Sequence, residues 1–83
     1  MQKAEILGIV IKHLRANAFI PNNVEIDPTK SMQEQGAKSL EATQAIYGVM
    51  RELNIDLPRE KMSNLETIDQ FVDLFVKTKN EEF

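Results

Sequence analysis

The stretch that decides the fold runs from Gly36 to Leu53 and reads GAKSLEATQAIYGVMREL. Its apolar residues recur at intervals of three and four, which is the spacing of one face of an α-helix. The stripe that we assign to the core consists of Ala42, Ile46, Val49 and Leu53. We therefore predict an amphipathic helix from Ser39 to about Leu53.

The same helix carries a second stripe. Leu40, Thr43 and Tyr47 follow one another at spacings of three and four, which places them around its side. Gly48 either weakens the helix locally or lets a neighbouring element approach closely. We predict Ser39 as the N-cap, because a serine hydroxyl accepts a hydrogen bond from an unpaired backbone N–H of the first turn.

Helical patterns continue on both sides of this stretch. Residues 2–17 form an apolar face that consists of Ile6, Leu7, Val10, Ile11 and Leu14. Pro58 suits the first turn of a short helical piece that runs through Met62. Thr67 and Gln70 have the spacing of a capping box, which predicts the start of a last helix. The apolar face of that helix consists of Ile68, Phe71, Val72, Phe75 and Val76.

The connection of residues 18–37 is long for a compact domain, where such loops are usually functional or carry structure of their own. Asp27, Pro28 and Thr29 predict a turn within it. Its apolar side chains predict that it packs against the helices, and they are Phe19, Ile20, Val24, Ile26 and Met32.

No segment shows sustained strand-type alternation, and no internal repeat is visible. Three main helices and one short helix predict an all-α bundle. The 83 residues have room for one domain, which we predict to span 1–83 with its core at about 4–78. Residues 80–83 are predicted to be a frayed tail.

Composition excludes several classes of function. The chain has no cysteine, which removes disulfides, thiolate nucleophiles and Cys-based metal sites, and we expect no metal site. The single histidine, His13, offers little to a catalytic triad, and we predict it to be a surface or boundary residue. A formal net charge of −3 argues against nucleic-acid binding. No apolar run is long enough to span a membrane and no signal peptide is visible, so we expect a cytoplasmic monomer.

Residues 36–41 resemble the modification site of acyl carrier proteins, which is usually written Gly-x-Asp-Ser-Leu followed by Asp or Glu. A glycine lies upstream of Ser39, while Leu40 and Glu41 follow it. Residues 54–58 resemble that family's link from the second helix to the short third helix, and residues 65–68 resemble the start of its last helix. The resemblance extends over about residues 6–76 and implies a four-helix bundle of the acyl-carrier type.

The resemblance also implies a function. Ser39 would carry 4′-phosphopantetheine from coenzyme A through a phosphodiester, and the thiol of this arm would hold an acyl group as a thioester. The cofactor would supply the sulfur and the protein would supply placement. Residues that match the family's partner-facing positions are Leu40, Glu41, Thr43 and Tyr47. Residues that fall near the groove for the acyl chain are Ile46, Met62 and Leu65.

The partners that the resemblance implies are a phosphopantetheinyl transferase and acyl-processing enzymes such as a ketosynthase, an acyltransferase or a dehydratase. The chain itself would be a non-catalytic carrier. We expect it to serve a specialised fatty acid or polyketide-type pathway, because its second helix lacks the family's acidic character. From Lys38 to Leu53, Lys38 and Arg51 balance Glu41 and Glu52, so the formal charge is zero.

Lys38 stands where the family usually has aspartate. A cation at a helix N-terminus is disfavoured by roughly 0.3–1 kcal/mol, which affects folding little. Recognition by partners is more sensitive, since charge complementarity sets on-rate and partner choice. Lys38 could also pair with the phosphodiester of the arm, which would partly restore the local charge balance.

Other interpretations stay open at this point. Ser39 could be a plain helix cap, and the chain could be an adaptor or structural protein that kept the fold and lost the modification. Lys38 favours that alternative, whereas the intact sequence of Ser39, Leu40 and Glu41 opposes it. An aminoacyl or peptidyl carrier is a further alternative. A small hydrolase or transferase is disfavoured because the usual catalytic residues are nearly absent.

Overall fold

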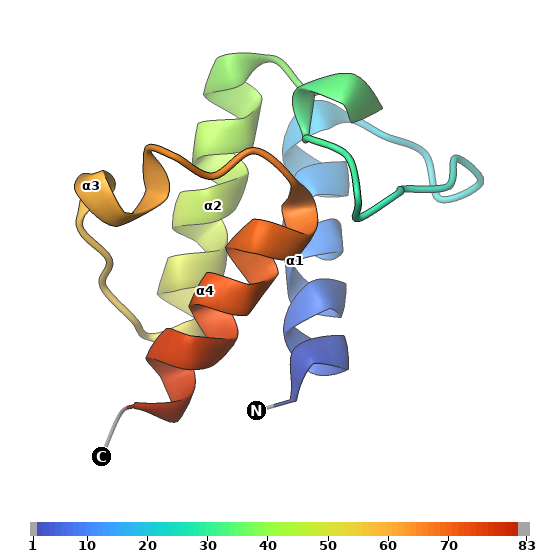
Figure 1. Cartoon of the computed structure of the whole chain (residues 1–83). Coiled ribbons are helices and arrows are strands. Elements are labelled where there is room, and N and C mark those ends of the chain that lie inside the picture. Colours follow the sequence, from blue (N-terminus) through green and yellow to red (C-terminus); the bar gives the residue numbers. More distant parts are fainter. Residues whose placement is uncertain (1, 82–83) are drawn as a thin grey trace.

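Three long helices make up most of the molecule: α1 (Lys3–Ala18), α2 (Ser39–Leu53) and α4 (Ile68–Asn80) (Figure 1). The connections contain the short helix α3 (Arg59–Met62) and one 3₁₀ turn, η1 (Gln33–Gln35). The computed structural model describes residues 2–81, and within that range no strand forms. The predicted all-α bundle of three main helices and one short helix is confirmed.

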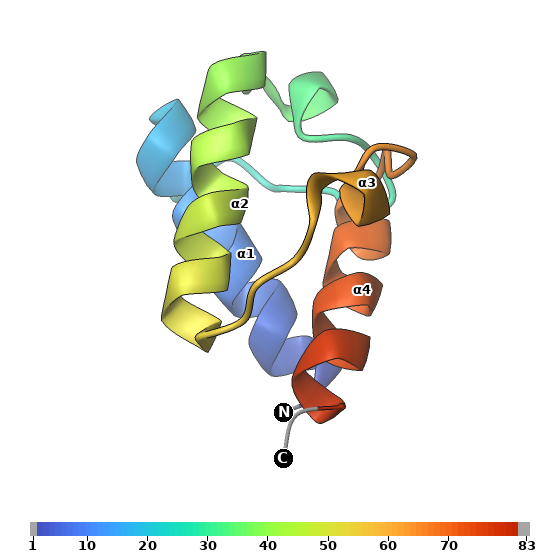
Figure 2. The same ribbon diagram turned by 90° about the vertical axis from the view of Figure 1, so that its left-hand side faces the viewer.

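Helix α1 packs against both α2 and α4 and runs antiparallel to α2 (Figure 1). The start of α1 and the end of α4 lie at the same end of the bundle. Figure 2 shows α3 at the side of the bundle. In the sequence, α3 lies between α2 and α4. None of the helices within residues 2–81 combines the length and apolar character that a bilayer crossing requires.

The core is a single apolar cluster to which every long helix contributes. Its largest fully buried side chains are Phe75, Ile6, Leu14, Met32, Ile68, Val10, Val49 and Val72. Of the fourteen residues predicted from helical periodicity, ten are buried. The other four are only half-buried: Leu7, Ile11, Ile46 and Val76. Ile46 lines a groove described below.

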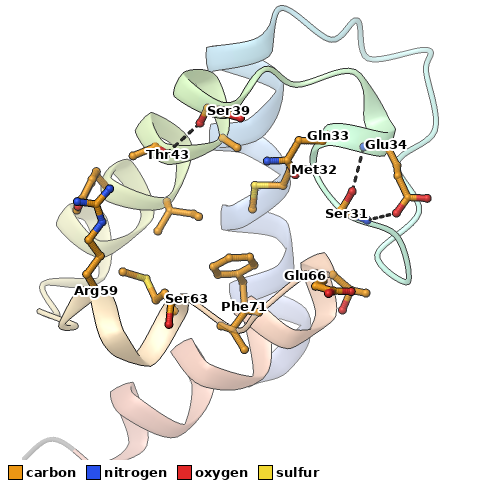
Figure 3. A pocket seen from close by; sticks show the side chains of 16 residues that line it. Ser31, Met32, Gln33, Glu34, Ser39, Thr43, Arg59, Ser63, Glu66 and Phe71 are labelled. Atoms are coloured by element: carbon orange, nitrogen blue, oxygen red, sulfur yellow. Dashed lines mark hydrogen bonds between the residues drawn. The ribbon is translucent and has the colours of Figure 1, made fainter.

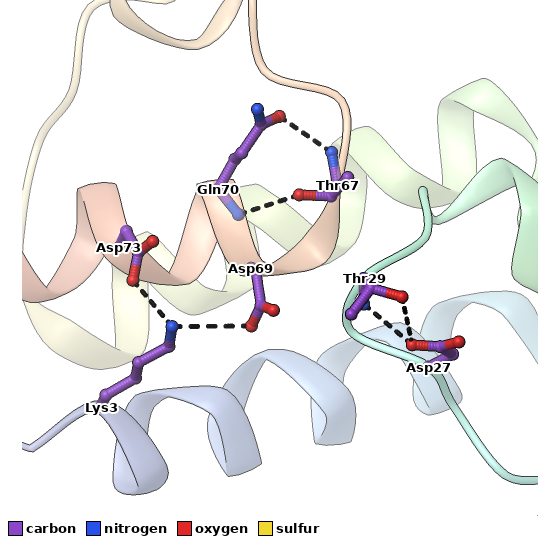
Figure 4. A network of polar contacts seen from close by, with 7 residues as sticks. All are labelled: Lys3, Asp27, Thr29, Thr67, Asp69, Gln70 and Asp73. Carbon is purple, nitrogen blue, oxygen red and sulfur yellow. Dashed lines mark hydrogen bonds and ion pairs between the residues drawn. The ribbon is translucent and has the colours of Figure 1, made fainter.

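Two residues with positive φ end the first two long helices. Phe19 (φ 57°) follows α1 and Asn54 (φ 55°) follows α2, each in the left-handed conformation that commonly terminates a helix. At the start of α4, the Gln70 N–H donates to Thr67 Oγ1 (3.2 Å) and the Thr67 N–H donates to Gln70 Oε1 (3.0 Å) (Figure 4). The predicted capping box is therefore confirmed.

The long connection packs only in part as predicted. Ile26 and Met32 are buried, and Ile20 is half-buried. Phe19, however, is 85% exposed and Val24 is 43% exposed, so the prediction that they pack inward was wrong. An irregular segment has no period that would indicate which of its apolar side chains face the core.

Asp27 and Thr29 form the turn that was predicted in this connection. The N–H and the hydroxyl of Thr29 both donate to Asp27 Oδ1, at 2.9 and 2.7 Å (Figure 4). These bonds, chiefly the one from the hydroxyl, lower the pKa of Asp27 below its usual value.

Ion pairs join the helices at the surface. Lys3 Nζ on α1 lies 3.0 Å from Asp73 Oδ1 and 3.7 Å from Asp69 Oδ1 on α4 (Figure 4). Between α1 and α2, Glu52 Oε1 lies 2.6 Å from Lys12 Nζ and 2.8 Å from His13 Nε2. His13 is partly buried at this boundary, as predicted.

The C-terminal tail differs from its prediction. Residues 80–83 were expected to fray, but Asn80 is the last residue of α4. The Glu81 N–H still donates to the Lys77 carbonyl at 3.1 Å. Continued helical hydrogen bonding therefore holds this turn together, and residues 82–83 lie outside the described part of the chain.

Candidate functional site

Ser39 is the first residue of α2, and its side chain is exposed. The N-cap is Lys38 and not Ser39, so the prediction of Ser39 as the cap was wrong. The helix begins one residue earlier than a serine cap requires, because the Lys38 N–H donates to Glu41 Oε1 at 2.8 Å. Within residues 2–81 the Ser39 hydroxyl has no hydrogen-bond partner, and it is therefore available to an incoming group.

A groove with a volume of about 540 Å³ opens beside Ser39 (Figure 3). Side chains from α2, α3, α4 and η1, and from the loops before η1 and α4, line it. They are Ser31, Met32, Gln33, Glu34, Ser39, Ala42, Thr43, Ile46, Tyr47, Arg59, Met62, Ser63, Leu65, Glu66, Thr67 and Phe71. The groove thus joins segments that are up to forty residues apart in the sequence.

The lining has an apolar part and a polar part. Met32 and Phe71 are buried, while Ile46, Met62 and Leu65 are half-buried and pack against the core cluster. Figure 3 shows the Phe71 ring between Met32 and the α3 side of the groove. The exposed members are charged or polar and include Glu34, Arg59 and Glu66. Such a lining can cover an apolar chain while polar groups remain in contact with water.

Backbone pairing between the long connection and α4 holds one side of the groove. The Ile68 N–H donates to the Lys30 carbonyl (3.0 Å), and the Asp69 N–H donates to the Pro28 carbonyl (2.9 Å). An isolated antiparallel bridge joins Ser31 to Thr67 at the same place. Because the first N–H groups of a helix have no partner within it, the loop carbonyls satisfy donors of α4 and become ordered in turn.

A short capping arrangement orders the loop residues that face Ser39. The Glu34 N–H donates to Ser31 Oγ and the Ser31 N–H donates to Glu34 Oε1, both at 3.1 Å (Figure 3). Gly36 then adopts a φ of 104°, which a glycine tolerates and other residues rarely adopt. The chain turns there and reaches Ser39 three residues later.

The structure brings some of the predicted site residues together. Ser39, Thr43, Ile46, Tyr47, Met62 and Leu65 all line the groove. Leu40 does not line it and is 68% exposed on the outer surface of α2. Glu41 is only half-exposed, and its carboxylate accepts the Lys38 N–H. Lys38 is exposed and forms no ion pair within residues 2–81.

Sequence reasoning did not select several members of the lining. Ser31 and Glu34 come from the irregular connection, Arg59 and Ser63 from the region of α3, and Phe71 was assigned only to the core. The spacing of Ser31 and Glu34, three residues apart, is a capping-box signal that could have identified an ordered turn there.

Within residues 2–81, no three His, Asp or Glu side chains are arranged to hold a metal ion. The groups whose pKa departs clearly from the usual value are Lys3, Asp27 and Glu52, and none of them lines the groove. The chemically distinctive feature is an accessible hydroxyl at a helix N-terminus, beside a partly apolar groove.

Comparison with known proteins shows the fold of this chain but no family. No family model matches the chain, and no curated protein matches it. A solved structure does match, with a TM-score of 0.83 and 28% identity over 93% of this chain and 99% of that one. It is a crystal structure of the curacin biosynthetic pathway HMG synthase in complex with its acetyl donor-ACP. This chain has an acyl-carrier-like fold.

The likeness extends over nearly the whole length of both chains. Because the match covers almost all of both chains, they are of similar length, and no large insertion separates them. The long connection and α3, which together supply six of the sixteen residues that line the groove, belong to this carrier-like fold.

Proposed function

We propose that this chain is an acyl carrier protein, which holds acyl intermediates as thioesters on a 4′-phosphopantetheine arm at Ser39 and presents them to partner enzymes. The observation that carries the proposal is the exposed, unpartnered Ser39 hydroxyl at the start of α2, beside a groove with an apolar floor. The likeness to a carrier-containing complex supports it independently.

The residues around Ser39 fit such an arm. A phosphodiester at this position lies against the unpaired N–H groups and the positive end of the dipole of a 15-residue helix. The exposed Lys38 adds a cation beside it, which makes Lys38 a candidate phosphate contact. When bound, the arm supplies the thiol that a cysteine-free chain lacks.

The groove fits the acyl chain that such an arm would carry. Ile46, Met62 and Leu65 supply apolar walls within reach of Ser39, because all four residues line one cavity. Covering apolar surface is worth about 25 cal/mol per Å², so a sheltered acyl chain would stabilise the loaded protein. Leu40, Thr43, Tyr47 and Glu41 remain the proposed docking residues on α2.

The proposed partners are a phosphopantetheinyl transferase and acyl-processing enzymes such as a ketosynthase, an acyltransferase or a dehydratase. The matching structure contains a biosynthetic HMG synthase together with a donor carrier, which favours a polyketide-type pathway for this chain. The neutral charge of α2 favours dedicated partners over housekeeping fatty acid synthesis. A cytoplasmic location and a monomeric state stay predictions.

An intact-mass measurement tests the proposal. The purified chain is incubated with coenzyme A, magnesium and a broad-specificity phosphopantetheinyl transferase. We expect the mass to increase by one phosphopantetheine, and we expect Ser39→Ala to abolish the increase. Ser31→Ala and Ser63→Ala are matched controls, because both serines line the same groove and neither begins a long helix. Both controls should be modified like the parent chain.

The opposite result would favour the second candidate function. If transferases from several pathways add nothing, the chain is better explained as an adaptor that uses the carrier-like fold for binding alone. Lys38 in the place of the family's aspartate is the observation that favours this candidate. Lys38→Asp should then restore modification.

A further inference from the structure

A second cavity, with a volume of about 550 Å³, lies between α1 and α2. His13 and Asn17 line it from α1, and Gln44, Tyr47, Gly48 and Arg51 line it from α2. Tyr47 lines this cavity and the groove beside Ser39, so the two cavities adjoin each other. The second cavity is polar, whereas the groove has an apolar floor.

Polar side chains dominate the lining, and no acid belongs to it. The Arg51 guanidinium always carries a positive charge, and within residues 2–81 it forms no ion pair or hydrogen bond. Glu52 is adjacent in the chain, but its carboxylate is bound by Lys12 and His13. The cavity therefore presents positive charge that no described residue compensates.

Arg51 belongs to a continuous face of α2. Leu40, Gln44, Tyr47 and Arg51 follow one another at spacings of four, three and four, which aligns them along one side of the helix. At 1.5 Å per residue this face is about 16 Å long. Leu40 is 68% exposed and Tyr47 is 46% exposed. Tyrosine and arginine are the side chains most often responsible for binding energy at protein interfaces.

We infer that this face receives an acidic side chain of the docking protein, whose carboxylate binds between Arg51 and Tyr47. The inference rests on the proposed carrier function and adds the chemistry of the partner to it. A guanidinium matches a carboxylate with two parallel hydrogen bonds, and Tyr47 and Gln44 line the same cavity as Arg51. Arg51 thus selects a dedicated partner that has an acidic side chain opposite it.

The charge of the cavity favours a carboxylate over a phosphate group. Phosphate groups are usually bound by clusters of arginines. This cavity has one arginine, and the imidazole of His13 is already bound to Glu52. A single arginine among polar side chains is better matched to the single negative charge of an aspartate or glutamate.

The test is a titration of the ¹⁵N-labelled chain with N-acetylglutamate α-methylamide, which carries a single carboxylate, at constant ionic strength, followed by NMR. We expect saturating shifts of the Arg51 side-chain N–H and of the Gln44 and Asn17 side-chain amides. Arg51→Gln should raise the dissociation constant at least threefold. Lys61→Gln is the matched control, since it removes one exposed positive charge of α3 outside the cavity, and it should leave the constant unchanged.

Three results would overturn the inference. They are shifts that increase linearly without saturation, an unchanged constant in Arg51→Gln, and inorganic phosphate that binds at least tenfold more tightly than N-acetylglutamate α-methylamide. Backbone shifts far from α1 and α2 report whether each variant is folded. Because the titration does not involve Ser39, its failure is distinct from a failure of the mass measurement, which reports only on modification.

Discussion

At the scale of single residues, Gly48 shows how close α1 and α2 are. A Cβ atom at Gly48 would lie 2.5 Å from His13 Nδ1, and the His13 ring is held by its bond to Glu52. Of the two roles predicted for this glycine, the close approach of a neighbouring element is confirmed. This position requires glycine, because any larger side chain would displace the His13 ring.

Gly48→Ala is therefore expected to destabilise the protein. Alanine improves helix propensity by about 1 kcal/mol. Overpacking at a tight contact costs about 1–3 kcal/mol, so the net loss in the free energy of unfolding should be about 1 kcal/mol. Urea unfolding followed by circular dichroism measures it.

Gly8→Ala is the matched control for this prediction. Gly8 also lies within a helix, but a Cβ there would meet nothing within 4 Å. This substitution should stabilise the protein by about 0.5–1 kcal/mol. Equal stabilisation by both alanines would mean that the His13 ring moves aside freely, and it would contradict the close approach.

At the scale of elements, Glu52 joins α2 to α1. Its hydrogen bonds to Lys12 and, secondarily, to His13 lower the pKa of the Glu52 carboxyl below its usual 4.5. A carboxyl with a lowered pKa in the folded state stabilises that state above the unfolded pKa. The stabilisation is lost as the pH falls through the lower, folded pKa.

Glu52→Gln should therefore lower the free energy of unfolding at neutral pH, and the difference from the parent chain should vanish as the pH falls below about 4.5. The effect is expected to be small and to decrease with added salt, because the pair is at the surface. Urea unfolding at a series of pH values measures it. A difference that is the same at pH 3 and pH 7 would mean that the charge of Glu52 contributes nothing.

At the scale of the whole molecule, the groove is formed by segments that only the complete fold brings together. If an acyl chain on the arm occupies it, longer chains bury more apolar surface, at about 0.8 kcal/mol for each buried CH₂. Because this burial exists only in the folded state, it increases the stability of that state. The thermal midpoint should thus rise with acyl length and level off once the groove is full.

Differential scanning calorimetry of the modified chain loaded with acetyl, butyryl, hexanoyl and octanoyl groups measures this trend. Ile46→Ala is expected to reduce the rise, because Ile46 is a groove wall and only half-buried. The modified chain without an acyl group is the baseline. Midpoints that do not depend on acyl length would mean that the cargo stays in solvent and that the groove has another role.

The sequence by itself determined the helices. The expected ranges of 2–17 and 39–53 agree with α1 (Lys3–Ala18) and α2 (Ser39–Leu53) to within one residue. The start of α4 followed from Thr67 and Gln70. These features are local, since periodicity and capping depend on residues within one or two turns of each other. The resemblance at residues 36–41 was equally local, and it led to Ser39.

The tertiary structure alone decided what surrounds Ser39. The sequence could not indicate that Ile26 is buried while Phe19 is exposed, because irregular backbone imposes no period on its side chains. Nor could it show that Ser31 pairs with Thr67, or that Arg51 and His13 line one cavity, since each pair lies more than thirty residues apart in the chain. Both cavities depend on such pairings, because each is enclosed by side chains of helices and loops that meet only in the packed bundle.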